Sequence, residues 1–388
     1  MAKQDAGRKE QALGFSVPHY RLDYENQRTD YGIGIIGLHW VMQIMHLPAY
    51  QAARYDVVTA AEINEDRIEE TRRKGFDVGH ITRDWHEVIE NEDVEVVDCC
   101  FGAGEEKERL RMQVIEAAGE AGKHLMIHKP VATTIESAER MARAAEEAGI
   151  RLVVNQNCRH NPACYSIKQL LTPERMGRPG VIELQNYWQG GPLDLEDPMP
   201  AYLGHVIHHA DLLRWWVGEP CVCVKSWAGM KTTMAIYEFE GGTVAYHMEN
   251  HSGMEAHRTN FRVMAEGGSI RAQHNWNWHF PGPGEREFVE VFTERDEDPV
   301  RFDLPQHVYE PVWSDINPWE PLEGAWYDLA GPVAGMMGTM GSLMRGVEND
   351  CPPDNRIGGA IESLRMCLAA QLAAKTGKPV DPRDLPTG

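Results

Sequence analysis

The chain has 388 residues, a length that favours two domains over one ordinary core. It carries 38 basic and 59 acidic residues, and the formal charge of −21 disfavours nucleic acid and anionic membranes as partners. No apolar run approaches the roughly 18 residues of a membrane span, and the N-terminus lacks the apolar stretch of a signal peptide. The eight cysteines include no Cys-x-x-Cys pair. We therefore expect a cytoplasmic protein with reduced thiols.

Residues 1–30 are polar and lack periodicity, so we expect an N-terminal arm that is either loose or laid across a neighbouring subunit. From residue 31 to residue 155, short apolar segments alternate with helical patterns. The expected strands are Tyr31–Ile36, Asp56–Ala61, Val94–Cys100, His124–Ile127 and Arg151–Val154. This alternation predicts βαβ units and a parallel, doubly wound sheet of the Rossmann type.

Beyond residue 155 the pattern changes, and residues 156–388 are expected to form an α+β domain for substrate and oligomer contacts. Several strand-like segments follow one another without helices between them: Gly180–Trp188, Cys221–Trp227, Thr233–Glu240, Thr243–Asn250 and Phe261–Ala265. Turns such as Gly241-Gly242 separate them, which predicts a large, mostly antiparallel sheet. Helices are expected at Pro162–Leu171, Tyr202–Trp216, Val333–Val347 and Gly359–Lys375. The segment from His279 to Pro321 is expected to form long loops.

The glycines near the first strand match a dinucleotide-binding pattern only in part. Gly32, Gly34 and Gly37 satisfy Gly-x-Gly-x-x-Gly, but the first two fall inside the apolar segment, so Gly37 is the expected turn glycine. Two interpretations stay open. Either the loop has another shape, in which His39 or Trp40 contacts the phosphates, or dinucleotide binding has weakened.

Glu62 favours the first interpretation. It ends the second expected strand, where an acidic side chain accepts hydrogen bonds from the adenosine ribose hydroxyls and disfavours a 2′-phosphate. NAD is therefore expected over NADP. The alternative for Glu62 is a solvated carboxylate at the start of a helix.

Four motifs occur in the order found in the glucose–fructose oxidoreductase / inositol dehydrogenase (Gfo/Idh/MocA) family. They are Gly37…His46-Leu-Pro-Ala-Tyr50, Ala118-Gly-Glu-Ala-Gly-Lys-His124, His128-Lys129-Pro130 and His208-His-Ala-Asp-Leu-Leu-Arg-Trp215. The chain resembles that family clearly over about residues 31–220. The resemblance implies an NAD(H)-dependent oxidoreductase that acts on a secondary alcohol or ketone of a sugar, glycoside or cyclitol. It also implies a homodimer or homotetramer.

The resemblance also assigns roles to individual residues. Lys129 matches a family lysine that contacts cofactor and substrate, and His208 matches a catalytic histidine. An imidazole suits proton transfer from the alcohol, and an ammonium stabilises the developing oxyanion. The implied cofactor contacts are Gly34, Gly37, Leu38, His39, Glu62, His128, Lys129 and Pro130. The candidate substrate contacts are Asn157, Arg159, Tyr187, Trp188, His205, His209 and Asp211.

The sequence departs from the family at its reacting centre. His128 replaces the glutamate of the Glu-Lys-Pro motif, and Gly204 stands at the catalytic aspartate position beside His205. These departures keep two alternatives open. One is a lyase, hydrolase or isomerase that uses the histidines, with a metal or a recycled NAD. The other is a non-catalytic subunit protein.

The histidines invite a metal hypothesis, because positions i, i+3 and i+4 share one helix face. His205, His208 and His209 have this spacing, and His247 and His251 add candidates. No Cys or carboxylate pattern of known spacing accompanies them, so a polar substrate pocket without metal is the expectation.

Overall fold

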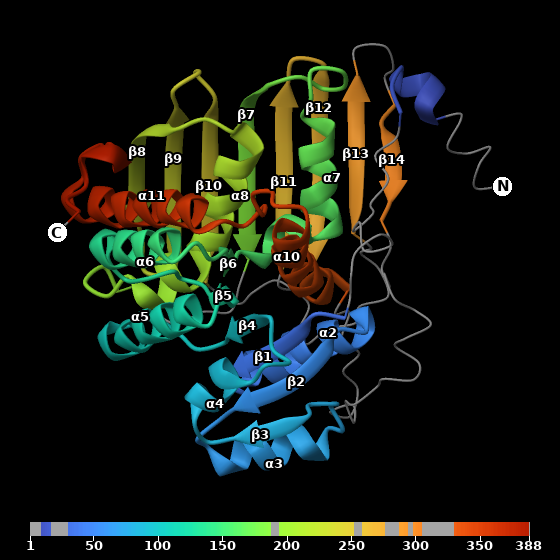
Figure 1. The fold of residues 1–388 in the computed structure, drawn as a ribbon. Helices are drawn as coiled ribbons and strands as arrows, with labels where there is room; N and C mark the ends of the chain where they lie inside the picture. The colour runs from blue at the N-terminus through green and yellow to red at the C-terminus, as the bar shows by residue number, and fades with distance from the viewer. Residues whose placement is uncertain are drawn as a thin grey trace.

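The computed structural model describes residues 9–16, 30–187, 194–251, 258–275, 287–293, 298–304 and 330–387. These residues form two sheets with helices between and around them (Figure 1). The expected α/β architecture, with a parallel sheet followed by a mostly antiparallel one, is confirmed. The eight cysteines are free, as expected.

The first sheet is parallel and has the order β3-β2-β1-β4-β5-β6, which is the doubly wound Rossmann order. Its strands are β1 (Gly32–Ile36), β2 (Asp56–Ala61), β3 (His80–Thr82), β4 (Val96–Cys99), β5 (His124–His128) and β6 (Leu152–Asn155). The sequence analysis missed β3. At three residues, this strand is too short to show an alternating pattern.

Helices α2 (Leu47–Ala53), α3 (Glu65–Arg73), α4 (Trp85–Glu90), α5 (Glu105–Glu120) and α6 (Ile135–Glu147) connect these strands. Polar side chains cap several of them: Asn64 accepts from the backbone of Arg67, and Thr134 from that of Ser137. Before α2 the chain forms a π-helix, η1 (Met42–His46). Pro48 follows it and cannot donate a backbone hydrogen bond, which suits a locally widened helix.

The second sheet has the order β14-β13-β12-β11-β7-β10-β9-β8, and only β7 and β10 pair in parallel. The strands are β7 (Pro179–Tyr187), β8 (Cys221–Ala228), β9 (Thr232–Phe239), β10 (Val244–Asn250), β11 (Arg258–Ala265), β12 (Gly268–Asn275), β13 (Phe288–Thr293) and β14 (Val300–Asp303). The expectation of loops from His279 to Pro321 was wrong for β13 and β14. Val289 and Val291 alternate into the core there, amid charged neighbours that obscured the pattern. The rest of that segment lies outside the described residues.

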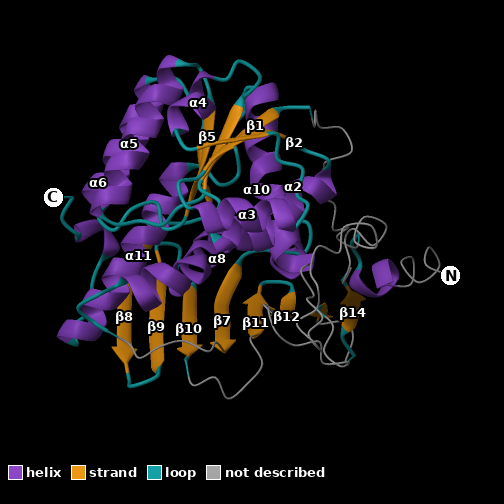
Figure 2. Cartoon of the chain, turned by 90° about the horizontal axis from the view of Figure 1, so that it is seen from below, coloured by secondary structure: helices purple, strands orange, loops and turns teal. Residues whose placement is uncertain are grey.

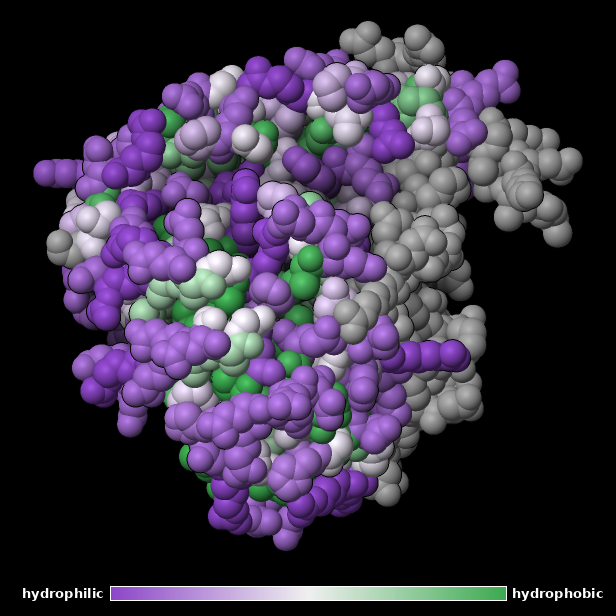
Figure 3. All heavy atoms as spheres, viewed as in Figure 1, coloured by the Kyte–Doolittle hydropathy of each residue, from purple (hydrophilic) through white to green (hydrophobic). Residues whose placement is uncertain are grey.

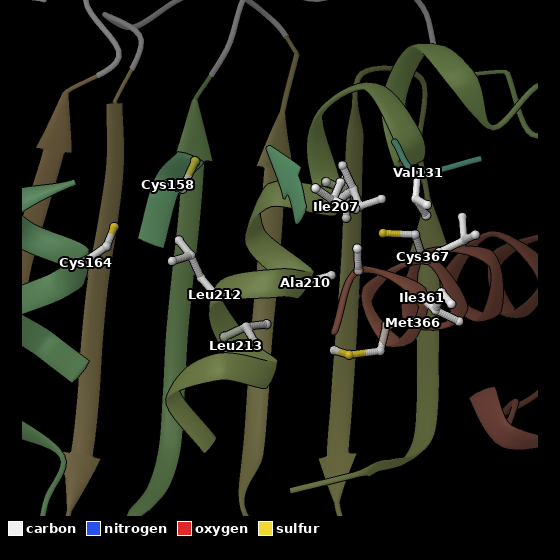
Figure 4. Close-up of a cluster of buried hydrophobic side chains, with 14 of the residues drawn as sticks. Val131, Cys158, Cys164, Ile207, Ala210, Leu212, Leu213, Ile361, Met366 and Cys367 are labelled. Atoms are coloured by element: carbon white, nitrogen blue, oxygen red, sulfur yellow. The ribbon is translucent and has the colours of Figure 1, made fainter. Parts of the chain in front are cut away.

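Helices cover one face of this second sheet (Figure 2). They are η2 (Asn157–His160), α7 (Pro162–Leu170), the π-helix η3 (Met199–Val206), α8 (Ile207–Val217) and α11 (Ile357–Thr376), with the short η4 (Pro382–Asp384) near the C-terminus. Figure 4 shows Leu212 and Leu213 of α8 with Ile361 and Met366 of α11 in one apolar cluster over the strands. These side chains fix α8, and with it the histidines of this helix, against the sheet.

Helix α10 (Ala330–Glu348) returns from the C-terminal part of the chain to the first sheet. Its methionines, among them Met336 and Met340, lie in one buried cluster with Tyr31 and Ile33. Residues near the end of the chain therefore complete the core on one side of the first sheet.

The described part of the expected N-terminal arm is not loose. Residues 9–13 are helical, and Leu13, 4% exposed, is buried against this chain's own core.

The face seen in Figure 3 is mostly hydrophilic, with apolar side chains in small groups. Among the described residues, no helix has the length and apolar character needed to cross a bilayer.

Candidate active site

The turn after β1 has the geometry expected of Gly37. This glycine has a φ of 96°, and its N–H donates to the carbonyl of Ala61 at 2.8 Å. A Cβ at this position would approach the Cys100 carbonyl oxygen to 2.9 Å. A side chain would therefore be strained by backbone conformation and by lack of space. Gly34 instead lies within β1, where a Cβ would meet Val88 at 2.5 Å, so its place is explained by packing against α4.

Glu62 is buried at the end of β2 and organises the adjacent loops. Its Oε2 accepts from the N–H of Leu38 at 2.8 Å, and its Oε1 accepts from the N–H groups of Ile63 and Asn64 at 2.9 Å each. The guanidinium of Arg67 lies 3.5 Å from Oε2. With 5% exposure, Glu62 is not the solvated carboxylate of the alternative interpretation.

A cavity of about 510 Å³ opens at this edge of the first sheet. Gly37, His39 and Glu62 line it, as do three cationic side chains, Arg67, Arg83 and Lys107. Burial, followed by the charges of Arg67 and Lys107, lowers the pKa of His39, so its imidazole is neutral at neutral pH. Trp40 is 53% exposed and does not contribute to the lining of this cavity.

Lys129 lies just beyond β5 and is bonded to the chain before α8. Its Nζ donates to the carbonyl of Gly204, and the following peptide bond to Pro130 is cis. Burial lowers the pKa of Lys129 to about 8. Lys129 therefore connects the carboxyl edge of the first sheet to the histidine-bearing helix of the second domain.

His128, at the end of β5, is half-buried beside a second polar group. Burial, and then the charges of Lys129 and His46, hold the pKa of His128 well below its ordinary value. Asp98 accepts from Tyr50 Oη at 2.5 Å and lies 2.7 Å from His46 Nδ1. The ring of His46 in turn lies beside that of His128, with the ring centroids 6.0 Å apart.

His208 is buried on α8. Burial, and then the nearby charge of Lys129, hold its pKa well below the ordinary value of histidine. His205 and His209 lie beside it, with ring centroids 6.3 Å apart for His205 and His208 and 5.4 Å apart for His205 and His209. The helix thus presents three imidazoles near Lys129.

The inner face of the second sheet supplies a polar row beneath these histidines. Strand register aligns Thr233, Glu249, Asn186, Thr259 and His274 across β9, β10, β7, β11 and β12, and all five are buried. Burial alone would raise the pKa of Glu249, but His205 and His209 hold it well below the ordinary value. Burial, and then His209, lower the pKa of His247 to about 3.

Two predicted substrate contacts are bonded to each other. Arg159 and Asp211 form a buried bidentate ion pair with two nitrogen–oxygen distances of 2.5 Å. Arg159 also donates to the carbonyl of Asp354, and Ser363 donates to Asp211. These bonds hold η2 against α8 and α11, and the predicted substrate contacts of Arg159 and Asp211 stay a prediction.

The remaining predicted substrate contacts do not all lie near the histidines. Tyr187 shares the outer sheet face with Gln185, whose side chain accepts from its hydroxyl at 3.3 Å, whereas the neighbouring Asn186 faces the histidines. Asn157 is buried under α10, against Gly335. Trp188 lies outside the described residues. The structure therefore brings together Lys129, His205, His208 and His209, but not Tyr187 or Asn157.

The sequence analysis missed Glu249 and Asn186. A signal for Glu249 was present, since His247-x-Glu249-x-His251 alternates and places all three side chains on one face of a strand. Asn186 carried no such signal, because only the pairing register shows that it lies beside Glu249.

Comparison with known proteins agrees with this architecture. Residues 31–156 match a family model described as an oxidoreductase family with an NAD-binding Rossmann fold, GFO_IDH_MocA. Over its N-terminal domain, the chain is similar to the Gfo/Idh/MocA family.

Two characterised relatives share part of the sequence. Levoglucosan dehydrogenase of Pseudarthrobacter phenanthrenivorans is 30% identical over 172 residues, which is 41% of this chain and 42% of that protein. Inositol 2-dehydrogenase of Salmonella typhimurium is 25% identical over 195 residues, 50% of this chain and 55% of that protein. The chain thus matches only about half the length of these relatives.

The fold extends over nearly the whole chain. A solved structure of levoglucosan dehydrogenase, in complex with NADH and levoglucosan, superposes with a TM-score of 0.69. That match covers 91% of this chain and 99% of the other at 19% sequence identity. At this identity the likeness establishes the fold alone.

Proposed function

We propose that this protein is an NAD(H)-dependent oxidoreductase that interconverts a secondary alcohol and a ketone on a sugar, glycoside or cyclitol-like substrate. The position of Lys129 is the observation that carries the proposal. It follows β5 of the NAD-binding fold and is bonded to Gly204, so one half-buried cation lies between the dinucleotide sheet and the histidines of α8. The partial relatives named above act on such substrates.

The chemistry assigned to this chain uses two groups. NAD⁺, when bound, accepts a hydride from the substrate carbon. His208 takes the proton of the substrate hydroxyl, and the ammonium of Lys129 stabilises the oxygen as negative charge develops. Burial strengthens the effect of that charge because little water screens it. His128 and Pro130 border Lys129 on the cofactor side.

We propose NAD as the preferred dinucleotide, because the buried carboxylate of Glu62 lies in the cavity beside Gly37 and would repel a 2′-phosphate. Nucleotide release from denatured protein, followed by fluorescence titration with NADH and NADPH, measures this directly. We expect NADH to bind about tenfold more tightly or better, a difference of about 1.4 kcal/mol. Equal affinities would contradict the assignment to Glu62, and absence of binding would contradict the whole proposal.

The role of Lys129 is tested by Lys129→Met, which removes the charge and keeps an unbranched side chain of similar length. Turnover on a panel of sugars and cyclitols should fall at least a hundredfold, with the thermal midpoint retained. Lys123→Met is the matched control. Lys123 likewise donates to backbone carbonyls, those of Asn91 and Val94, and lies at the opposite end of β5. Full activity in Lys129→Met would refute the assignment.

We further propose a homodimer or homotetramer that uses the outer face of the second sheet. That face and its adjoining turn carry exposed apolar side chains, including Trp227 at 55% and Met230 at 84%. A second copy would cover them. Light scattering coupled to size-exclusion chromatography tests this, and Trp227→Glu should shift the mass toward the monomer.

A further inference from the structure

Glu249 lies at the centre of a buried ring of imidazoles. Its Oε1 is 2.7 Å from Nδ1 of His205, and its Oε2 is 3.5 Å from Nδ1 of His209 and 3.6 Å from Nε2 of His247. Nε2 of His251 is 4.0 Å from Oε1. Every ion-pair partner that the described residues give this carboxylate is a histidine. A carboxylate with 0% exposure is costly to bury without a cation.

The spacing of these atoms suits a small metal ion. His205, His209 and Glu249 each offer one ligand atom, and the three atoms lie within 4.8 Å of one another. Tetrahedral zinc, with bonds of about 2.0–2.1 Å, separates its ligand atoms by roughly 3.3 Å. The 3.5 Å between Oε2 and Nδ1 of His209 is close to that value, whereas the 2.7 Å between Oε1 and Nδ1 of His205 is a hydrogen-bond distance that must lengthen when an ion enters.

The helix and the strand place these ligands without distortion. His205 and His209 are four residues apart across the junction of η3 and α8, so both point to the same side. His247 and Glu249 alternate onto the inner face of β10. Nε2 of His209 is buried and has no hydrogen-bond partner among the described residues, although its Nδ1 lies 3.1 Å from His247.

Neighbouring side chains limit the orientations that these residues can adopt. Asn186 lies beside Glu249 in the strand register, and its Nδ2 is 3.4 Å from Nδ1 of His205. Thr259 in turn donates to Asn186 Oδ1 at 2.8 Å. The ring of His247 limits rotation of the His209 ring.

We propose that His205, His209 and Glu249 bind one divalent transition-metal ion of the zinc class. Two imidazoles and one carboxylate form a ligand set that leaves a position for water or a substrate oxygen. Gly204, whose carbonyl binds Lys129, immediately precedes His205. The ion would therefore act as a Lewis acid on the oxygen of the same substrate that Lys129 contacts. This inference goes beyond the proposed hydride transfer, which requires no metal.

A second group of ligand-type residues does not support the same argument. His46, Cys100 and His128 also lie close together. Both nitrogens of His46 have neighbours at bonding distance, Asp98 on Nδ1 and Asn155 on Nε2. Burial raises the pKa of the Cys100 thiol far above its ordinary value, which disfavours the thiolate that a metal needs.

The first test is metal content and metal binding in the full-length chain, purified without a histidine tag or chelator. Elemental analysis should find about one equivalent of a zinc-class metal. After removal with chelator, one equivalent of Co²⁺ should restore the site and produce the visible absorption of a low-coordinate Co²⁺ complex. Metal-free protein that also fails to bind Zn²⁺ or Co²⁺ in this titration would overturn the inference.

Variants locate the ion. Glu249→Gln and His209→Gln should each lower the affinity for Co²⁺ at least tenfold and leave NADH titration unchanged, because the first sheet is untouched. His86→Gln is the matched control, since His86 is exposed and pairs with Asp84 at the start of α4. Unchanged Co²⁺ affinity in Glu249→Gln would overturn the assignment. If that variant does not fold, the wild-type thermal midpoint decides, because a native-state ligand must raise it.

Discussion

The backbone N–H of Leu38 donates a 2.8 Å hydrogen bond to Oε2 of Glu62, and this bond joins the loop after β1 to the end of β2. The loop lacks the second and third glycines of a standard fingerprint, yet it is held in place by a neighbouring carboxylate. Glu62 therefore has two tasks in the proposed function. It fixes the loop, and it offers acceptor oxygens to the adenosine ribose.

Replacement of Glu62 by Gln should weaken NADH binding about tenfold and narrow the preference for NADH over NADPH. The amide keeps one acceptor oxygen for the loop but removes the negative charge that repels a 2′-phosphate. Fluorescence titration measures both affinities. Glu65 is an exposed acidic residue in the first turn of α3, and Glu65→Gln is the control. An equal change in affinity in that variant would show that the net charge of the protein, and not the position of Glu62, determines dinucleotide binding.

The Arg159–Asp211 pair predicts a large loss of stability when only one partner is removed. Arg159→Met removes the bidentate partner of a buried carboxylate, which then keeps only the Arg214 guanidinium at 3.5 Å, and should lower the free energy of unfolding by about 3 kcal/mol. The double variant with Asp211→Asn should recover part of that loss, because the buried charge is gone. Urea denaturation of the single and double variants tests this, and an effect below about 1 kcal/mol for Arg159→Met would contradict it.

Gly34 provides a test of its packing role. A methyl group there would meet Val88 at 2.5 Å, so Gly34→Ala should destabilise the protein by about 1–3 kcal/mol. NADH affinity of the folded variant should stay unchanged, because Gly34 does not contribute to the lining of the cavity. Gly358→Ala is the comparison, since no atom lies within 4 Å of its added Cβ. Loss of NADH binding in a stable Gly34→Ala protein would restore a cofactor role for this residue.

The buried imidazole of His160 should make the free energy of unfolding fall in acid. Burial lowers its pKa from 6.5 to about 4, against a smaller opposing effect of Asp354, with Arg159 and Arg345 also nearby. The unfolded chain therefore binds this proton more readily. The contribution of neutral His160 is complete above about pH 6.5 and is lost as pH falls toward 4, a change of about 2–3 kcal/mol.

Thermal or urea unfolding from pH 7 to pH 4 measures this dependence. His160→Gln keeps a donor toward Asn355 and should reduce the slope of stability against pH by up to one proton. His80→Gln, at an exposed histidine, should leave the slope unchanged. An unaltered slope in His160→Gln would assign the acid sensitivity to other buried histidines.

The fold could be predicted from the sequence because its signals are local. An apolar segment such as Val94–Cys100 indicates a strand, and a helix-spaced segment such as Ile135–Ala148 indicates a helix. Their alternation along the chain implies the parallel sheet. Strand β3 and the strands β13 and β14 were missed, because three residues carry too little pattern and charged neighbours mask a short alternation.

The site was harder to predict because it depends on register. Lys129 and His208 follow motifs and could be named, but Asn186 and Tyr187 are adjacent in sequence and face opposite sides of one strand. Arg159 and Asp211 looked like recognition groups, and only their distance in three dimensions shows that they bind each other. Polarity in a sequence does not reveal which polar groups are already paired.

The position of helix α10 in the sequence determines when the first sheet can finish folding during synthesis. Its methionines cover Tyr31 and Ile33, but a ribosome releases them about 300 residues after the strand that they protect. Until then, a nascent chain that ends near residue 155 presents a bare apolar surface on one side of its dinucleotide sheet. A fragment that ends at that boundary should aggregate or require a chaperone. Co-expression of residues 330–387 should raise the soluble fraction of that fragment.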